Sequence, residues 1–215
     1  MRVIASCLML FLSFAGSVAA ADLDVVTVAA PAINCRFDTD CKITVSDTTA
    51  VISTTNMKGQ GFLQSRTWPV GQPGTPGVKL FAYLYRIDLT QWLGHEGPSG
   101  QLPQTSSVIP CVTELRLPFG LVAPLDYDGN GDKDQVFIIT QGGLGSVKPT
   151  AVTQTGNQIT FKFLPPVCGS LTPGKGQTTF FFGLASTQPP QTVAAQVIND
   201  IAPPLTVKAR APKVP

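Results

Sequence analysis

The stretch Lys79-Leu-Phe-Ala-Tyr-Leu-Tyr-Arg-Ile-Asp-Leu89 alternates with a period of two residues, the period of a β-strand. One face of this strand carries five apolar side chains: Phe81, Tyr83, Tyr85, Ile87 and Leu89. The opposite face ends in Arg86 and Asp88 but begins with three apolar residues: Leu80, Ala82 and Leu84. We therefore expect one face to be buried along its whole length and the other only along its first half.

Other stretches rich in β-branched and aromatic residues extend this pattern along the chain. Residues 158–163 alternate polar and apolar side chains throughout, which indicates one buried face. Glycine (20 residues) and proline (19 residues) concentrate between the apolar stretches. About ten short strands separated by such residues predict an all-β fold, an antiparallel β-sandwich of the Ig-like or jelly-roll type. The predicted strands are residues 25–29, 42–46, 62–68, 79–89, 107–117, 135–141, 158–163, 178–184, 192–197 and 205–210.

Residues 1–20 have the features of a secretory signal peptide. Arg2 supplies a positive start, an apolar stretch follows, and Val18-Ala-Ala20 is a cleavage site of small residues. The apolar part is too short for a convincing transmembrane helix. We expect cleavage near Ala20 and release into the periplasm or the extracellular medium. A single domain, residues 21–210, should remain with a frayed tail, residues 211–215, and no membrane insertion.

Signal cleavage leaves four cysteines: Cys35, Cys41, Cys111 and Cys168. An even number in an oxidising compartment predicts two disulfides, for which three pairings are possible. We favour Cys35–Cys41, a small loop, and Cys111–Cys168, which ties distant strands together. A zinc site is the competing interpretation, but the chain has no C-x-x-C and one histidine.

An acidic loop, Asp126-Tyr-Asp-Gly-Asn-Gly-Asp-Lys-Asp134, precedes the apolar run 136–139. Calcium takes six to eight oxygen ligands, which short acidic loops supply at alternate positions. Counting from the first aspartate, oxygen-bearing side chains stand at positions 1, 3, 5 and 9, and position 7 offers a backbone carbonyl. The sequence thus predicts a Ca²⁺ site with these ligands: Asp126, Asp128, Asn130, Asp132 and Asp134.

The loop opens like an EF-hand but departs from it at position 12, where Phe137 replaces the bidentate glutamate. It resembles instead the D-x-[DN]-x-[DN]-G-x-x-D calcium loop of FG-GAP (integrin-type) repeats. In that family such a loop binds Ca²⁺ and leads into a strand. The resemblance covers about 15 of the 215 residues, in one copy, so it implies the loop and not the propeller. The competing interpretation is a β-hairpin turn, because Asn130-Gly131 favours a type I′ turn.

No recognisable catalytic set appears in the sequence. His95 is the single histidine, Ser99 is its neighbour in a Gly- and Pro-rich segment, and G-x-S-x-G and H-E-x-x-H are missing. The net charge of +2 and the low charged fraction of 13% argue against nucleic acid. The polar surface must be largely Thr, Gln, Ser and Asn, which is common in exported bacterial β proteins.

Three hypotheses about function follow. The first is a non-catalytic, calcium-stabilised protein with a structural or binding role outside the cell, its partner a glycan or a protein. The second is a carbohydrate-binding module, in which Trp92 or Tyr127, expected in loops, stack on sugar rings, while Trp68 lies at the edge of the core. The third is a secreted hydrolase that uses His95 or the aspartate loop.

Phe180-Phe-Phe182 predicts a strand covered on both faces, because its side chains cannot share one face.

Overall fold

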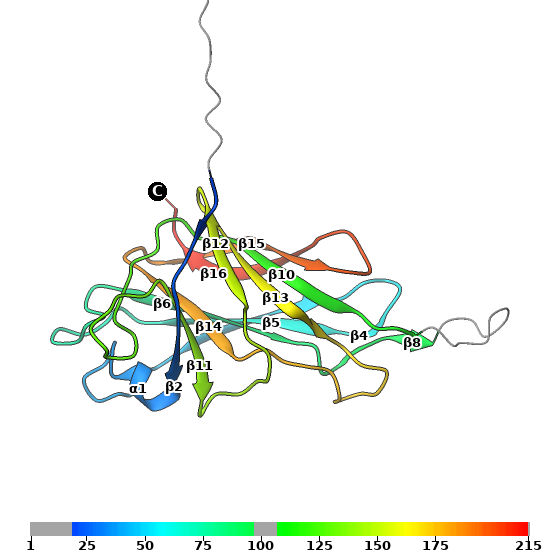
Figure 1. Cartoon of the computed structure of the whole chain (residues 1–215), viewed down its shortest axis with the longest axis horizontal. Coiled ribbons are helices and arrows are strands. Elements are labelled where there is room, and N and C mark those ends of the chain that lie inside the picture. Colours follow the sequence, from blue (N-terminus) through cyan, green and yellow to red (C-terminus); the bar gives the residue numbers. More distant parts are fainter. Residues whose placement is uncertain (1–18, 97–106, 215) are drawn as a thin grey trace, which may run out of the picture.

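The computed structural model describes residues 19–96 and 107–214 (Figure 1). Within these residues the chain forms sixteen β-strands and one short helix, α1 (Ala30–Asn34), which confirms the all-β prediction. Most of the predicted signal segment, residues 1–18, lies outside the described part, as does Ser99. In the described ranges, no helix has the length and apolar character needed to cross a membrane.

Two six-stranded sheets make up the body of the molecule. The first sheet is antiparallel throughout. Its strands, in spatial order, are β1 (Ala21–Asp22), β12 (Ala151–Thr155), β13 (Gln158–Cys168), β10 (Cys111–Pro118), β15 (Pro190–Asn199) and β16 (Leu205–Pro212). The second sheet contains one parallel pair, β2 with β11. Its strands, in spatial order, are β2 (Val25–Ala29), β11 (Val136–Gln141), β14 (Phe181–Ser186), β6 (Phe81–Asp88), β5 (Gly61–Trp68) and β3 (Ser46–Ile52).

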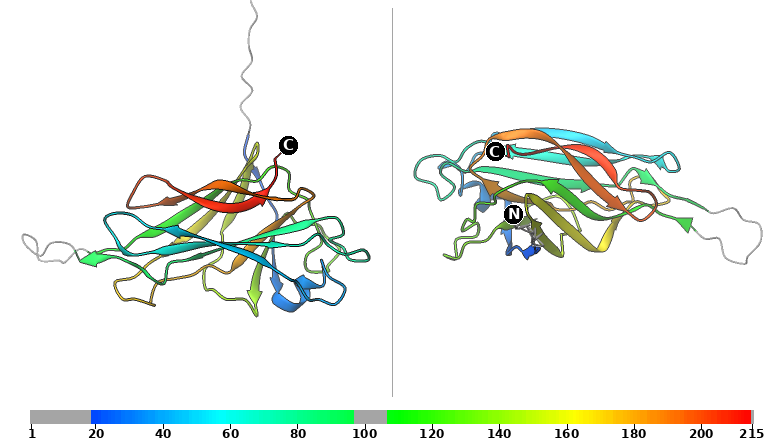
Figure 2. Two further views of the ribbon diagram at one scale, coloured as in Figure 1. Left: turned by 180° about the vertical axis from the view of Figure 1, so that it is seen from behind. Right: turned by 90° about the horizontal axis from the view of Figure 1, so that it is seen from above.

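The two sheets meet along both edges. The chain passes from β1 in the first sheet to β2 in the second through Leu23 and Asp24 alone. On the other side, β16 lies beside β3 (Figure 2). Two short pairs extend from the body: β4 (Lys58–Gly59) with β7 (Trp92–Leu93), and β8 (His95–Glu96) with β9 (Ser107–Val108).

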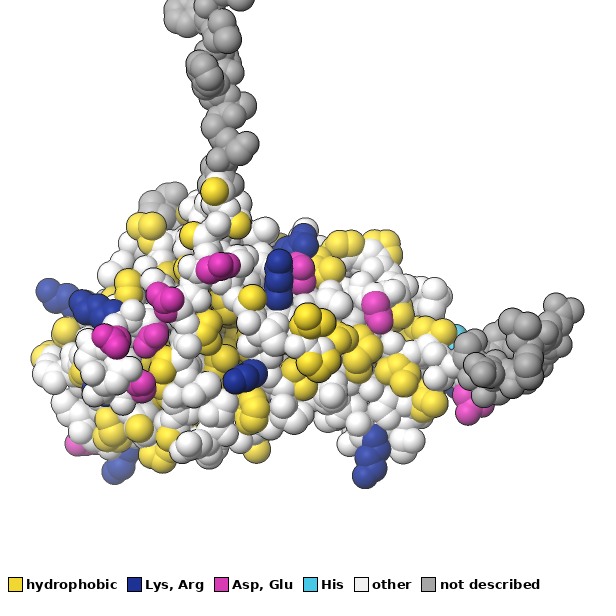
Figure 3. Space-filling view, in the orientation of Figure 1, with side chains coloured by type: hydrophobic (Ala, Val, Ile, Leu, Met, Phe, Trp, Pro, Cys, Tyr) yellow, Lys and Arg dark blue, Asp and Glu magenta, His cyan; other side chains and the backbone are white. Residues whose placement is uncertain are grey.

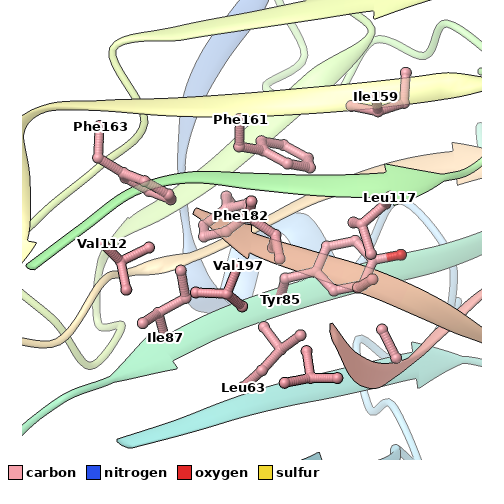
Figure 4. Packing of buried hydrophobic residues seen from close by; sticks show 14 of the residues in the cluster. Leu63, Tyr85, Ile87, Val112, Leu117, Ile159, Phe161, Phe163, Phe182 and Val197 are labelled. Carbon is pink, nitrogen blue, oxygen red and sulfur yellow. The ribbon is translucent and has the colours of Figure 1, made fainter. Parts of the chain in front are cut away.

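The main hydrophobic core lies between the two sheets. Side chains from both sheets point toward one another there, among them Tyr85 and Phe182 from the second sheet and Phe161 from the first (Figure 4). The two tyrosines of β6 keep their hydroxyls hydrogen-bonded at the rim: Tyr83 donates to the Gln188 carbonyl at 2.6 Å and Tyr85 to the Arg210 carbonyl at 2.8 Å. A buried polar group needs such a partner to avoid a desolvation penalty.

A second hydrophobic cluster covers part of the other face of the second sheet. It joins Phe137 of β11 and Leu84 of β6 to Ile33 of α1 and Phe37 of the segment that follows the helix. The expectation for β6 is confirmed, because Tyr83, Tyr85 and Ile87 lie in the main core whereas Ala82 and Leu84 lie in the second cluster. The expectation for the phenylalanine run is confirmed as well: Phe181 lies in the second cluster and Phe182 in the main core.

Several strand boundaries differ from the prediction. Residues 42–45 lie outside any strand, and the strand begins at Ser46 and runs to Ile52 as β3. β12 was not predicted, and the predicted strand 107–117 divides into β9 and β10. Both β3 and β12 lie at or near a sheet edge and carry mostly polar, partly exposed residues, so they lack the apolar alternation by which strands are recognised.

Disulfides join Cys35 to Cys41 and Cys111 to Cys168, the pairing favoured from the sequence. The second bond crosses directly between β10 and β13, where the two cysteines are register partners. The first closes a small loop that follows α1, and Phe37 inside this loop is buried in the second cluster. The four cysteines of the described residues are all paired, so none of them is a free thiolate for the competing zinc interpretation.

Candidate functional site

The acidic loop lies between Leu125 and β11. Leu125 and Asp134 form an antiparallel bridge. The Leu125 N–H donates to the Asp134 carbonyl at 2.9 Å, and the Asp134 N–H donates to the Leu125 carbonyl at 3.1 Å. The loop is therefore closed at its base and leads into a buried strand, as the sequence indicated. Acidic side chains gather on the side of the molecule that holds this loop (Figure 3).

Side-chain oxygens organise the loop from within. Asp126 Oδ1 accepts the Gly129 N–H at 2.6 Å, Asp128 Oδ1 accepts the Asn130 N–H at 3.1 Å, and Asn130 Oδ1 accepts the Asp132 N–H at 2.7 Å. Such bonds are the usual means by which Asp and Asn stabilise turns. Gly129 and Gly131 have positive φ values of 89° and 99°. Asn130 does not, so the alternative type I′ turn at Asn130-Gly131 is not formed.

Tyr127 anchors the loop to the protein. Its side chain is fully buried in the second cluster, and its ring centroid lies 4.7 Å from that of Phe137. Burial raises the pKa of the Tyr127 phenol far above its ordinary value. An aromatic ring of this size contributes strongly to packing, so Tyr127 fixes the position of the acidic residues on either side of it.

The burial of Tyr127 contradicts the expectation that Trp92 or Tyr127 stacks on sugar rings. Trp92 is also fully buried, in the main core, so neither aromatic is available to stack on a sugar. The error has a physical reason: both residues follow turn signals, but each turns inward and ties its segment to a core. Trp68, expected at the core edge, is 3% exposed and belongs to the second cluster.

Asp134 is the carboxylate of the loop whose surroundings disfavour its ionised form. Desolvation raises its pKa, and the nearby carboxylates raise it further, in the order Asp128, Asp24, Asp132 and Asp126. Its Oδ2 atom is buried and has no hydrogen-bond partner among the described residues. A carboxylate in this state lacks a counter-charge.

Arg36 brings one positive charge to the loop. Its Nη2 atom lies 4.0 Å from Asp126 Oδ1, and its Nε donates to the Tyr127 carbonyl at 3.4 Å. The guanidinium also lies against Gly129, where a Cβ would collide with it. Arg36 belongs to the Cys35–Cys41 loop, so the small disulfide loop and the acidic loop meet at this side chain.

The fit of these residues to a metal ion is mixed. Carboxylate and amide oxygens are the ligands that Ca²⁺ prefers, and Asp134 Oδ2 is a buried oxygen to which no described residue donates a hydrogen bond. However, in the described part of the chain no three His, Cys, Asp or Glu side chains are gathered closely enough to hold a metal. The five predicted ligands therefore share one loop, but their side chains would have to converge for an ion to bind.

The hydrolase hypothesis gains no support from the described residues. His95 is exposed in β8, where its backbone pairs with Val108 of β9. Its ring makes no hydrogen bond to a described side chain that could orient it, and the segment 97–106 that contains Ser99 is outside the description. A catalytic histidine needs a nucleophile and an orienting group within hydrogen-bond reach.

A groove of about 520 Å³ lies beside α1 on the second sheet. Trp68 lines it, together with Arg66, whose charge is already matched by Asp47 through two bonds of 2.8 Å. The hydrogen bonds from Arg66 lower the pKa of Asp47. The Arg66 guanidinium also lies 4.6 Å from the centre of the Phe181 ring. The groove thus offers mainly apolar surface and a neutralised charge.

Comparison with protein-family models, with curated proteins and with solved structures found no significant match.

Proposed function

We propose that this chain is an exported, non-catalytic protein with a calcium-stabilised β-sandwich, which has a structural or binding role outside the cell. The proposed export is supported by the signal pattern in residues 1–20 and by the two disulfides, which form in oxidising compartments. The proposed sandwich, of Ig-like or jelly-roll type, is supported by two six-stranded sheets that enclose one core.

One observation carries the calcium part of the proposal. One oxygen of Asp134 is buried with no hydrogen-bond partner among the described residues, and the Asp134 pKa is raised by burial and by four neighbouring carboxylates. A divalent cation at this point would remove the repulsion and supply the missing partner. Tyr127 holds the loop on the second cluster, so an ion bound there would stabilise the contact between the loop and the sheet. Calcium acts here as a structural clip.

A binding role would use the surface beside this loop or the groove at Trp68, with an extracellular glycan or protein as partner. The near-neutral charge and the mainly apolar groove favour neither an anionic ligand nor nucleic acid. The carbohydrate alternative has lost its two stacking candidates, Trp92 and Tyr127, because both are buried.

The test is a thermal melt of the oxidised protein in EGTA, in Mg²⁺ and in Ca²⁺. A ligand that binds only the folded state stabilises it by about 2.7 kcal/mol at 100 times its Kd, which raises the Tm of a domain of this size by roughly 5–11 °C. We expect this rise with Ca²⁺, little with Mg²⁺, and its loss in Asp128→Ala. Glu96→Gln, in β8 at the other end of the molecule, is the matched control and should keep the rise (Figure 1). Equal Tm values in EGTA and Ca²⁺ would remove the calcium part of the proposal.

A further inference from the structure

Asn130 is the one asparagine of five in the chain that a glycine follows. The other four, Asn34, Asn56, Asn157 and Asn199, are followed by Cys, Met, Gln and Asp. Asn130 is exposed at the tip of the acidic loop. A Cβ built on Gly131 would meet no described atom within 4 Å other than those of its two chain neighbours. Gly131 directly follows Asn130, has no side chain, and leaves open the space that a side chain would fill beside its backbone nitrogen.

We propose that Asn130 is a site of spontaneous deamidation, which converts it to aspartate or isoaspartate. The reaction begins when the Gly131 backbone nitrogen, on losing its proton, attacks Cγ of Asn130. A bond forms between that nitrogen and Cγ, the bond from Cγ to Nδ2 breaks, and Nδ2 leaves as ammonia with the proton. The product is a five-membered succinimide, and water then opens it at either carbonyl. One opening gives aspartate and the other gives isoaspartate, with no oxidation or reduction in either step.

The local hydrogen bonds favour the attack. Asn130 Oδ1 accepts the Asp132 N–H at 2.7 Å, which polarises the amide carbonyl that the nitrogen attacks. The same N–H is placed to stabilise the negative charge that develops on Oδ1 as the new bond forms. The remaining partner of the side chain, Asp128 Oδ2, accepts from Nδ2 at a longer 3.2 Å.

The reaction changes the charge of the loop permanently. It adds a carboxylate between Asp128 and Asp132, in a loop whose carboxylates already raise the pKa of Asp134. The aspartate product strengthens the need for a counter-ion. The isoaspartate product lengthens the backbone after residue 130 and so displaces the hydrogen bond that its side chain makes with Asp132. The inference concerns the Asn130-Gly131 pair and does not depend on whether the loop binds calcium.

The test is peptide mapping of the folded protein after storage at mildly alkaline pH, compared with a sample digested at the start. Trypsin should release residues 117–133, in which Asn130 is the sole side-chain amide, and residues 43–58, in which Asn56 is the sole one. Asn56 is also exposed and lies in a turn, but Met57 follows it, so it is an internal control in the same digest.

We expect peptide 117–133 to gain, over storage, the mass that replaces NH₂ by OH, and peptide 43–58 to keep its mass. Asn130→Gln should slow the change strongly, because its longer side chain must close a six-membered ring. An unchanged mass of peptide 117–133 after storage, or equal conversion of the two peptides, would overturn the proposal.

Discussion

Arg36 and Asp126 form the contact at which the two small loops of the molecule meet: Nη2 of the arginine lies 4.0 Å from Oδ1 of the aspartate. The arginine comes from the Cys35–Cys41 loop and the aspartate from the acidic loop, 90 positions further along the chain. Both loops pack on the second cluster through a buried aromatic, Phe37 in one and Tyr127 in the other. The salt bridge thus joins two segments that the cluster already holds side by side.

The first prediction concerns the charge of Arg36. Arg36→Gln removes the guanidinium from the acidic loop, so the repulsion among the carboxylates increases. The pair is partly exposed, so we expect a loss of about 0.5–1 kcal/mol of stability in EGTA, measured by urea denaturation. With Ca²⁺ the loss should shrink, because the ion replaces the missing positive charge.

The control for this variant is Arg116→Gln, which breaks the bond of 2.6 Å to Glu114 on the first sheet. Its loss should be the same in EGTA and in Ca²⁺. If Arg36→Gln also shows no difference between the two conditions, the guanidinium and the ion do not act on the same carboxylates.

The second prediction concerns Asp134 and pH. The folded protein raises the pKa of this carboxyl, so the folded state binds its proton more tightly than the unfolded state does. Ionisation of Asp134 therefore lowers stability as pH rises from the ordinary aspartate pKa, about 3.9, through the raised folded value. Asp134→Asn should be more stable than the parent at neutral pH in EGTA, and this gain should vanish below the ordinary pKa.

Stability measured against pH in EGTA, for the parent and for Asp134→Asn, checks this expectation. In Ca²⁺ the sign should reverse, since the variant loses a ligand. A variant that is less stable than the parent at neutral pH in EGTA would show that the Asp134 carboxylate already has a favourable partner.

The third prediction concerns Tyr127. Tyr127→Ala empties a fully buried aromatic site in the second cluster and should cost about 3–5 kcal/mol of unfolding free energy. Leu121→Ala is the matched control, because Leu121 lies in the same connection between β10 and β11 but is 81% exposed. That change should stay within about 0.5 kcal/mol. Similar losses in both variants, measured by urea denaturation, would contradict the role of Tyr127 as an anchor.

The elements that could be predicted from the sequence are those in which burial produces a regular pattern. β6 alternates because one face meets the main core, and the change at Arg86 marks where the second cluster ends. β3 could not be placed in the same way, because its first four residues are exposed and its position depends on hydrogen bonds to β5. Backbone pairing with β5 leaves no periodic signal in the side chains of a polar edge strand.

Part of the candidate site could likewise be predicted from the sequence, and part could not. The acidic residues and the strand that follows them were evident locally, since aspartate spacing and glycine positions are local features. The contact with Arg36 was not, because it depends on how the second sheet brings the Cys35–Cys41 loop to residues 126–129. Trp92 and Tyr127 were expected at the surface because the sequence places both in loops. In the structure each is fully buried in a core, and Trp92 belongs to β7.

The fourth prediction compares the two disulfides. Cys111–Cys168 spans 57 residues and Cys35–Cys41 spans 6. The chain-entropy model gives a stabilisation of about 4 kcal/mol for the longer loop and about 2 kcal/mol for the shorter one. We expect Cys111→Ser with Cys168→Ser to lose about twice the unfolding free energy that Cys35→Ser with Cys41→Ser loses, as measured by urea denaturation. The shorter loop holds Arg36, so its removal should also enlarge the stabilisation by Ca²⁺, as Arg36→Gln does, whereas removal of the longer one should leave that stabilisation unchanged. An equal Ca²⁺ response in the two double variants would show that the small disulfide loop does not influence the acidic loop.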